Sequence, residues 1–451
     1  MYEKKFCALA KGMKKKTKIL IAPIEIAGYY ANLAKGFKEL GVEHDFVVYT
    51  SHTFGYGGES KRPILLRVAD WFNQLRNERS FFLIKVISIV PMRFFTYLWG
   101  IAALFRYDVF VFGFGKSLFP NNIDLPILRF FGKKIISNLS HGSEARPPYI
   151  DGSYLSKEGD LSSIREIFSL VLRNKKILTK HLKYADLVIG APYSSSQFAK
   201  NTFINYLNIG IPITYNYSKK VDTIPVNFEY TSFEQKIRIL HSPSNPVSKG
   251  TGQITKAIEN LKSKGYLIDF ILIHNRPFHE VLFEIQQCDF VVDQIYSDTP
   301  MAGFATEAAW FGKPAVVGGY GLEKLKRFLP DDMWPPSKIT HPDFIEEAIE
   351  DLLMSKDNRE KLGIAAQTFV RDKWNSVEVA KKYLCLIKGE VPLDWIINPM
   401  DIEYLEGVGQ SVSRTKLTIR QLTSAYGVDA LQLNHRPELE ALFMKFANEQ
   451  N

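Results

Sequence analysis

The segment over residues 291–317 constrains the fold of this chain more strongly than any other. A short apolar run ends at Val292, a polar loop follows, a helix can begin at Gly303, and a Gly-Lys-Pro break precedes a second apolar run at residues 315–317. Short β-branched runs bounded by turn residues are typical of buried parallel strands. The segment therefore predicts a helix whose N-terminal amides face the carboxyl end of a parallel sheet, where α/β proteins bind ligands and the helix dipole favours anions.

Glu307 lies in the first turns of this predicted helix. A carboxylate at that place can accept two hydrogen bonds from a ribose diol while backbone N–H groups hold a phosphate. The pattern thus indicates a nucleotide site. The residues that we expect to line it along the loop and the start of the helix are Thr299, Met301, Ala302 and Gly303.

Composition bounds the fold class and the compartment. A chain of 451 residues is too long for one ordinary domain, and 46% hydrophobic with 23% charged residues is ordinary for a soluble globular protein. Cys7, Cys288 and Cys385 are too widely separated for a disulfide framework or a metal motif, and they suit a reducing compartment. No signal-peptide pattern is visible near the N-terminus. We therefore expect a cytoplasmic protein of two or three domains.

Residues 81–105 come nearest to a transmembrane segment, but Lys85, Pro91 and Arg93 interrupt them. A membrane-spanning helix needs roughly 20 mainly apolar residues. The stretch is more typical of a helix buried in a protein core, and contact with a membrane is the alternative.

The net charge of +9 is unevenly distributed. The first 230 residues contain about 32 Lys and Arg against about 18 Asp and Glu, and the remaining residues carry a small negative surplus. A basic half with an aromatic amphipathic segment indicates an anionic partner, such as the inner face of a membrane or a lipid phosphate. Nucleic acid is disfavoured because no binding motif with recognisable spacing is present. A solvated surface without a partner is the other alternative.

Apolar runs alternate with helical periodicity in the first half of the chain. The predicted strands cover residues 18–23, 44–49, 107–113, 134–140 and 185–190, and helices are expected at 30–40 and across much of 64–105. This alternation predicts a parallel sheet. Gly28 lies in the first turn, but a complete G-x-G-x-x-G motif is absent, which disfavours a dinucleotide-dependent oxidoreductase.

A second α/β series follows residues 211–235, which we interpret as a link between domains. The predicted strands cover residues 237–241, 268–274 and 290–292, with a loop at 242–251, a helix at 253–264, helices from about residue 341, and a last helix at 436–448. We therefore predict an N-terminal domain over residues 1–215, a C-terminal domain over 216–390 and a helical extension over 391–451.

The loop after the first strand of the second series combines small polar residues with a lysine. Small side chains let the backbone approach a phosphate, and a lysine supplies a point charge. The P-loop spacing is absent, and a solvated loop lysine is the alternative. The residues that we expect to contact the ligand here are Ser244, Asn245, Lys249 and Gly250, with Asn275 and Arg276 at the end of the next strand.

Residues 141–146, His-Gly-Ser-Glu-Ala-Arg, follow a predicted strand of the first half. A histidine, an acid and an arginine this close can orient a hydroxyl group or neutralise developing negative charge, although a lone histidine is more often structural. We take His141 and Glu144 as candidate catalytic residues. The candidate acceptor contacts are Arg146 and, at the ends of other strands of the same sheet and expected in the same cleft, Gly28, Gly113 and Lys116.

Metal and serine-hydrolase chemistry are disfavoured by the sequence. The nine histidines are dispersed and form no ligand cluster, and the G-x-S-x-G motif is absent.

These motifs together resemble the GT-B glycosyltransferases, and among them the family-four, retaining group. The resemblance covers about residues 17–390 and rests on residues 141–144, on the Lys-Gly-Thr run that begins at Lys249, and on the Glu-Ala-x-x-x-Gly-Lys-Pro run that begins at Glu307. It implies an α/β fold of two Rossmann-like domains facing across a cleft, here with a helical C-terminal tail. It further implies that Lys249 holds the donor diphosphate, that Glu307 holds the ribose hydroxyls, and that His141 lies near the transferred sugar, with no metal or other cofactor.

Two positions depart from the family pattern. The family often has a further glutamate eight residues before the position of Glu307, where this chain has Thr299, with Asp298 beside it as the candidate replacement. The arginine that the family usually has upstream of the lysine is missing, because Ser244 and Asn245 occupy that loop.

The resemblance implies transfer of a sugar from a nucleotide-diphosphate sugar to a glycan or a lipid-linked glycan, with retention, in the assembly of a surface polysaccharide. Peripheral contact with the inner face of an anionic membrane is expected. The alternatives are a non-catalytic relative that binds a nucleotide sugar or glycan as an adaptor, and an epimerase that acts on a nucleotide sugar without an acceptor.

Overall fold

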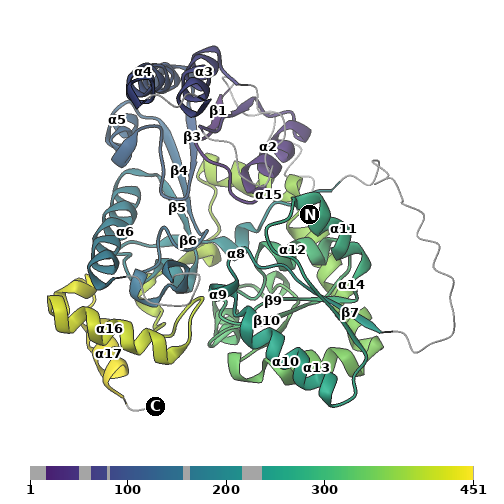
Figure 1. Ribbon diagram of the computed structural model, residues 1–451. Helices are drawn as coiled ribbons and strands as arrows, with labels where there is room; N and C mark the ends of the chain where they lie inside the picture. The colour runs from purple at the N-terminus through teal and green to yellow at the C-terminus, as the bar shows by residue number, and fades with distance from the viewer. Residues whose placement is uncertain (1–16, 50–61, 79–81, 156–162, 216–235, 450–451) are drawn as a thin grey trace.

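Two β-sheets form the framework of the protein, one in each half of the chain (Figure 1). The computed structural model describes residues 17–49, 62–78, 82–155, 163–215 and 236–449. The first sheet has seven strands in the order β12-β6-β5-β4-β3-β1-β2, and the second has five in the order β11-β10-β9-β7-β8. Each sheet is surrounded by helices, which confirms the predicted fold class of two Rossmann-like domains.

Most strands of the first sheet are apolar because helices cover both of its faces. The parallel strands are β1 (Ile19–Ile21), β2 (His44–Phe46), β3 (Val109–Gly113), β4 (Lys134–Leu139), β5 (Leu187–Gly190) and β6 (Phe203–Asn205). Ile19 and Ile21 pack into one core with α2 (Tyr29–Glu39) and α6 (Ile164–Tyr184). Leu20 points to the other face and packs into a second core with α4 (Phe82–Arg106) and α5 (Asp124–Phe130).

The second sheet follows the same principle. Its parallel strands are β7 (Ile237–His241), β8 (Ile268–Leu272), β9 (Phe290–Gln294), β10 (Ala315–Gly318) and β11 (Lys338–Thr340). Its helices are α9 (Pro246–Lys249), α10 (Thr251–Ser263), α11 (Phe278–Gln287), α12 (Gly303–Trp310), α13 (Ile345–Met354) and α14 (Lys356–Lys373). The prediction for residues 291–317 is confirmed, because they form β9, α12 and β10 with the helix beginning at Gly303. The predicted loop at 242–251 was wrong in one respect, since it contains the single turn α9, which the side chain of Asn245 caps.

The expectation of a buried helix at residues 81–105 was wrong. Trp99 and Leu104 of α4 pack into the core, and α3 (Ile64–Glu78) packs along the helix, but Val90 and Phe105 are 70% and 71% exposed. The sheet offers α4 only one face to cover, so the opposite face stays open. By length and composition alone, the part of α4 over Ile87–Arg106 could cross a membrane.

The last part of the chain returns to the first domain. Helix α15 (Ser376–Lys388) packs on α2, and β12 (Ile396–Ile397) pairs antiparallel with β6. Helix α16 (Val412–Tyr426) packs on α6 and on α17 (Pro437–Asn448), as Figure 1 shows at the lower left. The predicted domain boundaries stay predictions, and residues 216–235 at the first of them lie outside the described residues.

A glycine-rich loop before α16 joins the two domains. The N–H group of Gly152 in the first domain donates to the carbonyl oxygen of Val408 at 2.7 Å, and the N–H group of Gly409 donates to the carbonyl oxygen of Tyr296 in the second domain at 2.8 Å. The backbones approach so closely that a Cβ atom on Gly152 would lie 1.8 Å from the carbonyl oxygen of Gly409. The tail therefore fixes the distance between the two domains at this point.

Substitution of Gly152 by alanine tests this contact. We expect Gly152→Ala to lower the unfolding free energy by about 1–3 kcal/mol, because the new methyl group must displace the backbone around Gly409. Gly252→Ala is the matched control: nothing lies within 4 Å of its Cβ position in α10, so a gain of about 0.4–1 kcal/mol is expected. Thermal unfolding of both variants measures the difference, and equal melting temperatures would contradict the contact.

Candidate active site between the two domains

Two adjoining cavities lie between the domains, each of about 380 Å³. One is lined by residues of both domains and by Val408 and Gly409 of the tail, and the other lies mostly against the second domain. The residues that line both are Ala27, His141, Ser244, Lys249 and Gly303. The two cavities therefore form one continuous cleft at the carboxyl ends of both sheets, the place where open α/β sheets bind ligands.

The start of α12 faces this cleft. Ala302 and Gly303 line the cavity, and no side chain caps the N-terminus of the helix. Nothing lies within 4 Å of a Cβ position at Gly303, so the backbone there is open to a ligand. Uncapped N–H groups together with the helix dipole make this place suited to an anion such as a phosphate.

Two carboxyl groups lie close together beside that helix. Burial and the nearby carboxylate of Asp293 raise the pKa of Glu307 to about 8. One oxygen of Asp293, Oδ2, is buried without a hydrogen-bond partner among the described residues. Both residues line the same cavity. A buried carboxyl that resists ionisation and an unsatisfied oxygen beside it are unfavourable for folding, and such groups are typical of ligand sites.

Lys249 is the cation that pairs with Asp293 in the cleft. Its Nζ atom lies 3.6 Å from Oδ1 of Asp293 and donates a hydrogen bond to the side-chain oxygen of Gln294. The backbone positions it: α9 ends at Lys249, and Gly250 follows in the left-handed region with φ of 74°. The lysine therefore stands between the second sheet and the start of α12, within the same cavity as Gly303.

His141 lies on the opposite wall of the cleft, at the end of β4. Its Nε2 atom is 2.8 Å from the hydroxyl oxygen of Tyr30, and the ring of Tyr29 meets it edge to face at 5.3 Å. Burial lowers the pKa of His141 to about 4, so the imidazole is neutral at pH 7. Glu144 accepts a hydrogen bond from the backbone N–H of His141 at 2.9 Å, and burial raises the pKa of this glutamate to about 7.

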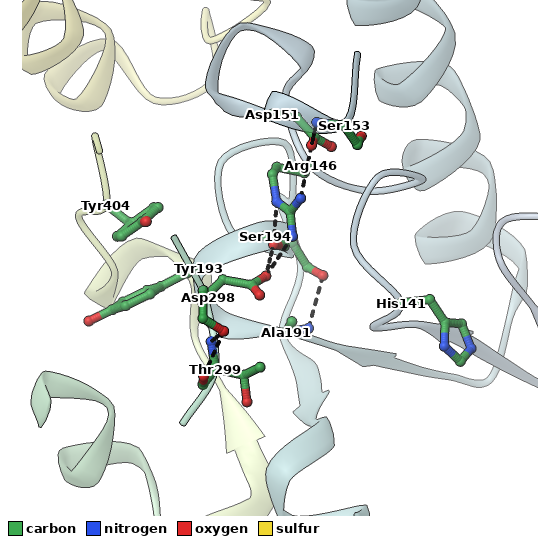
Figure 2. Close-up of polar contacts among 12 residues, drawn as sticks. His141, Arg146, Asp151, Ser153, Ala191, Tyr193, Ser194, Asp298, Thr299 and Tyr404 are labelled. Carbon is green, nitrogen blue, oxygen red and sulfur yellow. Dashed lines mark hydrogen bonds and ion pairs between the residues drawn. The ribbon is translucent and has the colours of Figure 1, made fainter. Parts of the chain in front are cut away.

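A buried arginine links the two domains beside this site (Figure 2). Arg146 of the first domain forms ion pairs with Asp151 at 3.1 Å and with Asp298 of the second domain at 2.8 Å, and its Nε atom donates to Ser194 at 2.8 Å. Ser194 in turn donates to the carboxylate of Asp298. The side chain of Arg146 is only 8% exposed, and its charge lowers the pKa of Asp298 although burial opposes that shift.

The loop that carries Asp298 is held to the first domain at a second point. The hydroxyl group of Tyr206 in α8 (Tyr206–Ile209) donates to the side chain of Thr299. Thr299 thus occupies the place where the family pattern has a glutamate, and its oxygen is already bonded. The carboxylate of Asp298 is also engaged, which gives it a structural role whatever its part in catalysis.

Most of the predicted site residues line the cleft. They are His141, Arg146, Ser244, Asn245, Lys249, Asn275, Arg276, Asp298, Thr299, Ala302, Gly303 and Glu307. Others lie behind its surface: Glu144 and Met301 are buried, and the Cβ position of Gly250 lies against Ile295. Their functional assignments stay predictions.

The expectation that two loops of the first domain line this cleft is confirmed for the first loop and was wrong for the second. At the first loop Ala27 and Tyr29 line the cleft, although Gly28 does not, and in the second the Cβ position of Gly113 lies against the hydroxyl group of Tyr30. Lys116 lines a separate cavity of the first domain. The chain turns sharply after β3, with positive φ at two successive residues, and this turn directs Lys116 away from the cleft.

Several residues of the cleft were not expected from the sequence. Tyr206 lines it from a short helix, Phe278 and Phe304 add apolar surface near Glu307, and Val408 and Gly409 enter from the tail. The tail carries the run Gly-Val-Gly at residues 407–409, and closely spaced glycines can indicate a close backbone approach. Nothing in the sequence indicates which part of the protein these glycines approach.

Within the described residues, no group of three or more His, Cys, Asp or Glu side chains is placed to hold a metal ion.

Comparison with known proteins gives matches of low sequence identity to solved structures. No protein-family model matches the sequence, and no curated protein matches it. Anabaena HepE in complex with UDP-glucose is 12% identical over 83% of this chain and 99% of that chain, with a TM-score of 0.46. The glycosyltransferase SnogD from Streptomyces nogalater is 11% identical over 82% and 100%, with a TM-score of 0.40. A TarM variant from S. aureus in complex with UDP is 10% identical over 82% and 99%, with a TM-score of 0.49.

Substitution of Asp298 tests its structural role. We expect Asp298→Asn to lower the unfolding free energy by up to about 3–5 kcal/mol, because it leaves the buried Arg146 with one carboxylate in place of two. Asp343→Asn is the control, since the side chain of Asp343 is 80% exposed and its loss is expected to cost less than about 0.5 kcal/mol. Urea unfolding measures both, and an unchanged stability of Asp298→Asn together with lost activity would assign Asp298 to the reaction alone.

The raised pKa of Glu307 predicts a stability that depends on pH. Between the ordinary glutamate pKa of 4.5 and the raised value of about 8, the unfolded chain loses the proton while the folded protein keeps it, so stability falls as pH rises through this window. Glu307→Gln removes this effect. We therefore expect the variant to gain melting temperature over the wild type, with a larger gain at pH 8.5 than at pH 5. A loss of stability that is equal at both pH values would contradict the burial of an ionisable group at this position.

Proposed function

We propose that the protein transfers a sugar from a nucleotide-diphosphate sugar to an acceptor, with the donor bound to the second domain. One observation carries this proposal: a carboxyl group, a lysine and an uncapped helix N-terminus converge on one wall of a cleft whose opposite wall carries a neutral histidine. A nucleotide-diphosphate sugar has a diol, two phosphates and a sugar in that order. The carboxyl group matches the diol, the lysine and the helix N-terminus match the two phosphates, and the histidine on the opposite wall matches the sugar.

The donor lies across both cavities in this proposal. The ribose hydroxyls form hydrogen bonds with the carboxyl group of Glu307, and Oδ2 of Asp293 is a further acceptor within the same cavity. The base occupies the space beside Asn275 and Phe278. The diphosphate lies against Lys249 and the start of α12, which directs the sugar toward His141.

Transfer requires that negative charge on the leaving diphosphate be stabilised. The charge of Lys249 and the N-terminal amides of α12 are fixed in place before the reaction, so they stabilise this charge without reorganisation. We propose that no divalent metal takes part, since these groups supply the positive potential.

His141 contacts the transferred sugar in this proposal. A pKa of about 4 keeps the ring neutral, so it can accept a hydrogen bond from a sugar hydroxyl or donate one, and it places no second positive charge near a sugar that becomes cationic during transfer. The hydroxyl group of Tyr30 fixes the orientation of the ring. Glu144 acts through the backbone of residue 141 and is a positioning residue.

The acceptor enters from the first domain, and the resemblance supports a glycan or a lipid-linked glycan in this role. Retention of the anomeric configuration, a place in surface polysaccharide assembly, and a cytoplasmic location at the inner face of a membrane are proposed on the same basis.

A non-catalytic adaptor is the second candidate, and one observation favours it. Asp298, the candidate replacement for the missing family glutamate, is tied to Arg146 and Ser194. Incubation of the protein with labelled nucleotide sugars separates the two, since an adaptor releases no nucleoside diphosphate. A new nucleotide sugar formed without an acceptor would identify an epimerase.

Variants of the donor site test the proposal. We expect Lys249→Ala and Glu307→Ala each to weaken nucleoside diphosphate binding by about tenfold or more, because the first variant loses a charge-assisted hydrogen bond to the diphosphate and the second loses the hydrogen bonds to the ribose diol. Lys256→Ala is the control, because Lys256 is an exposed lysine of the neighbouring helix α10. Titration calorimetry with UDP, ADP and GDP gives the affinities. If the wild type binds one of these nucleotides and both site variants bind it with the same affinity, the assignment is refuted.

A further inference from the structure

The first domain contains a second cavity, of about 390 Å³, outside the cleft between the domains. It lies between α4, the segment after β3 and α6. Helices α4 and α6 lie on the left side of the molecule in Figure 1. The glycosyl-transfer chemistry proposed above does not use it. We call it the flank cavity.

The interior of the flank cavity is apolar and aromatic. Tyr49, Tyr97, Leu118, Phe119 and Ile177 line it. The rings of Tyr97 and Phe119 lie 5.6 Å apart, and the absence of a side chain at Gly100 lets the ring of Phe119 approach α4, since a Cβ atom there would lie 2.9 Å from it. An interior of this kind favours a hydrocarbon ligand, because its burial removes apolar surface from water.

Four cations surround this apolar interior. They are Lys116, Arg173, Lys176 and Lys180, and no residue that lines the cavity is acidic. None of the four takes part in an ion pair within the described part of the chain. Lys180 donates to the backbone carbonyl of Asn121, whereas Lys116 and Lys176 are exposed. Four like charges around one opening repel one another unless an anion lies between them.

An exposed apolar surface leads to the cavity from outside. On α4 it consists of Ile87, Val90, Phe94, Leu98, Ile101 and Phe105, and on α5 with its flanks of Ile123, Ile127, Phe130 and Phe131. The rings of Phe105 and Phe131 lie 6.0 Å apart, so the two parts are continuous. Ile123 directly follows Asn122 at the wall of the cavity. Helix α4 contains no acidic residue. Exposed apolar surface of this extent is typical of a binding site.

The flank cavity and the cleft share a wall. In the turn after β3, the ring of Phe114 lies 6.4 Å from the ring of His141, whereas Gly115 and Lys116 line the flank cavity. The Cβ position of Gly115 is 3.7 Å from Cβ of Glu144, which bonds to the backbone of His141. A ligand in the flank cavity is therefore separated from the proposed transfer site by one turn of chain.

We propose that the flank cavity binds a lipid that carries a phosphate, with its hydrocarbon chain over the apolar interior and its phosphate between Lys116 and Lys176. The apolar surface of α4 and α5 gives the rest of the chain a path out of the cavity. The further step, that this lipid is the acceptor or carries it, rests on the proposed function. Binding of the lipid to the flank cavity does not depend on the proposed function.

Direct binding to the full-length protein tests the proposal, with dodecyl phosphate below its critical micelle concentration as the probe. Dodecanol and inorganic phosphate are the two partial probes, because each carries one half of the chemistry. We expect the wild type to bind dodecyl phosphate at least about tenfold more tightly than either, as both the chain and the anion contribute. Equal binding of dodecanol would indicate a plain apolar groove, and equal binding of inorganic phosphate a plain anion site. Either result would overturn the proposal.

Charge-reversal variants locate the site. We expect Lys116→Glu with Lys176→Glu to weaken dodecyl phosphate binding by about tenfold or more. Lys183→Glu is the matched control, because Lys183 is exposed on the same helix α6 but does not line the cavity, and a change of less than about twofold is expected. An equal loss in the control would show unspecific attraction to a basic surface and would contradict the site.

Binding of UDP, ADP or GDP to the same samples separates this inference from the proposed function. Wild-type affinity for a nucleoside diphosphate in the double variant shows that the protein is folded and that its cleft is intact. If no nucleoside diphosphate binds to the wild type while dodecyl phosphate does, the proposed function fails and the lipid site stands. If the wild type binds a nucleoside diphosphate and no dodecyl phosphate, the lipid site is refuted.

Discussion

The buried guanidinium group of Arg146 lies between the two domains of this protein. Removing such a charge from water costs several kcal/mol. The ion pair of Arg146 with Asp151 in the same domain offsets part of that cost, and the pair with Asp298 contributes only while both domains stay in place. The walls of the cleft, and with them His141 and Glu307, therefore keep their relative positions without a ligand. The backbone bonds through Gly409 act in the same direction from the tail.

The donor half of the cleft combines groups that disfavour folding. Glu307 keeps a proton that it would lose in water, and Asp293 has an oxygen without a partner in the described structure. Lys249 compensates one carboxylate and leaves the other buried. A nucleotide with two hydroxyls and two phosphates would satisfy all three residues at once. Groups that destabilise the unbound protein and become satisfied by a ligand are typical of a binding site. The electrostatics of this wall of the cleft therefore support the proposed function.

The sequence predicted the two α/β series and the β9–α12–β10 unit because short buried strands and a glycine at a helix start are local signals. It predicted Lys249 and Glu307 together because both follow strands whose carboxyl ends meet at one edge of a sheet. It missed the pairing of Arg146 with Asp298, since two residues 152 positions apart carry no local mark of their contact. It also misjudged α4, because the apolar periodicity of a helix does not tell whether another element covers both of its sides. Whether a helix face is covered depends on the tertiary arrangement alone.

A crystal structure of the protein with a bound nucleoside diphosphate is the decisive test of the proposed donor site. We expect the ribose hydroxyls within hydrogen-bond distance of the carboxyl group of Glu307, and the diphosphate against Lys249 and the first amides of α12, with its outer phosphate toward His141. A nucleotide bound elsewhere, or one in the cleft with its ribose remote from Glu307, would refute the donor site.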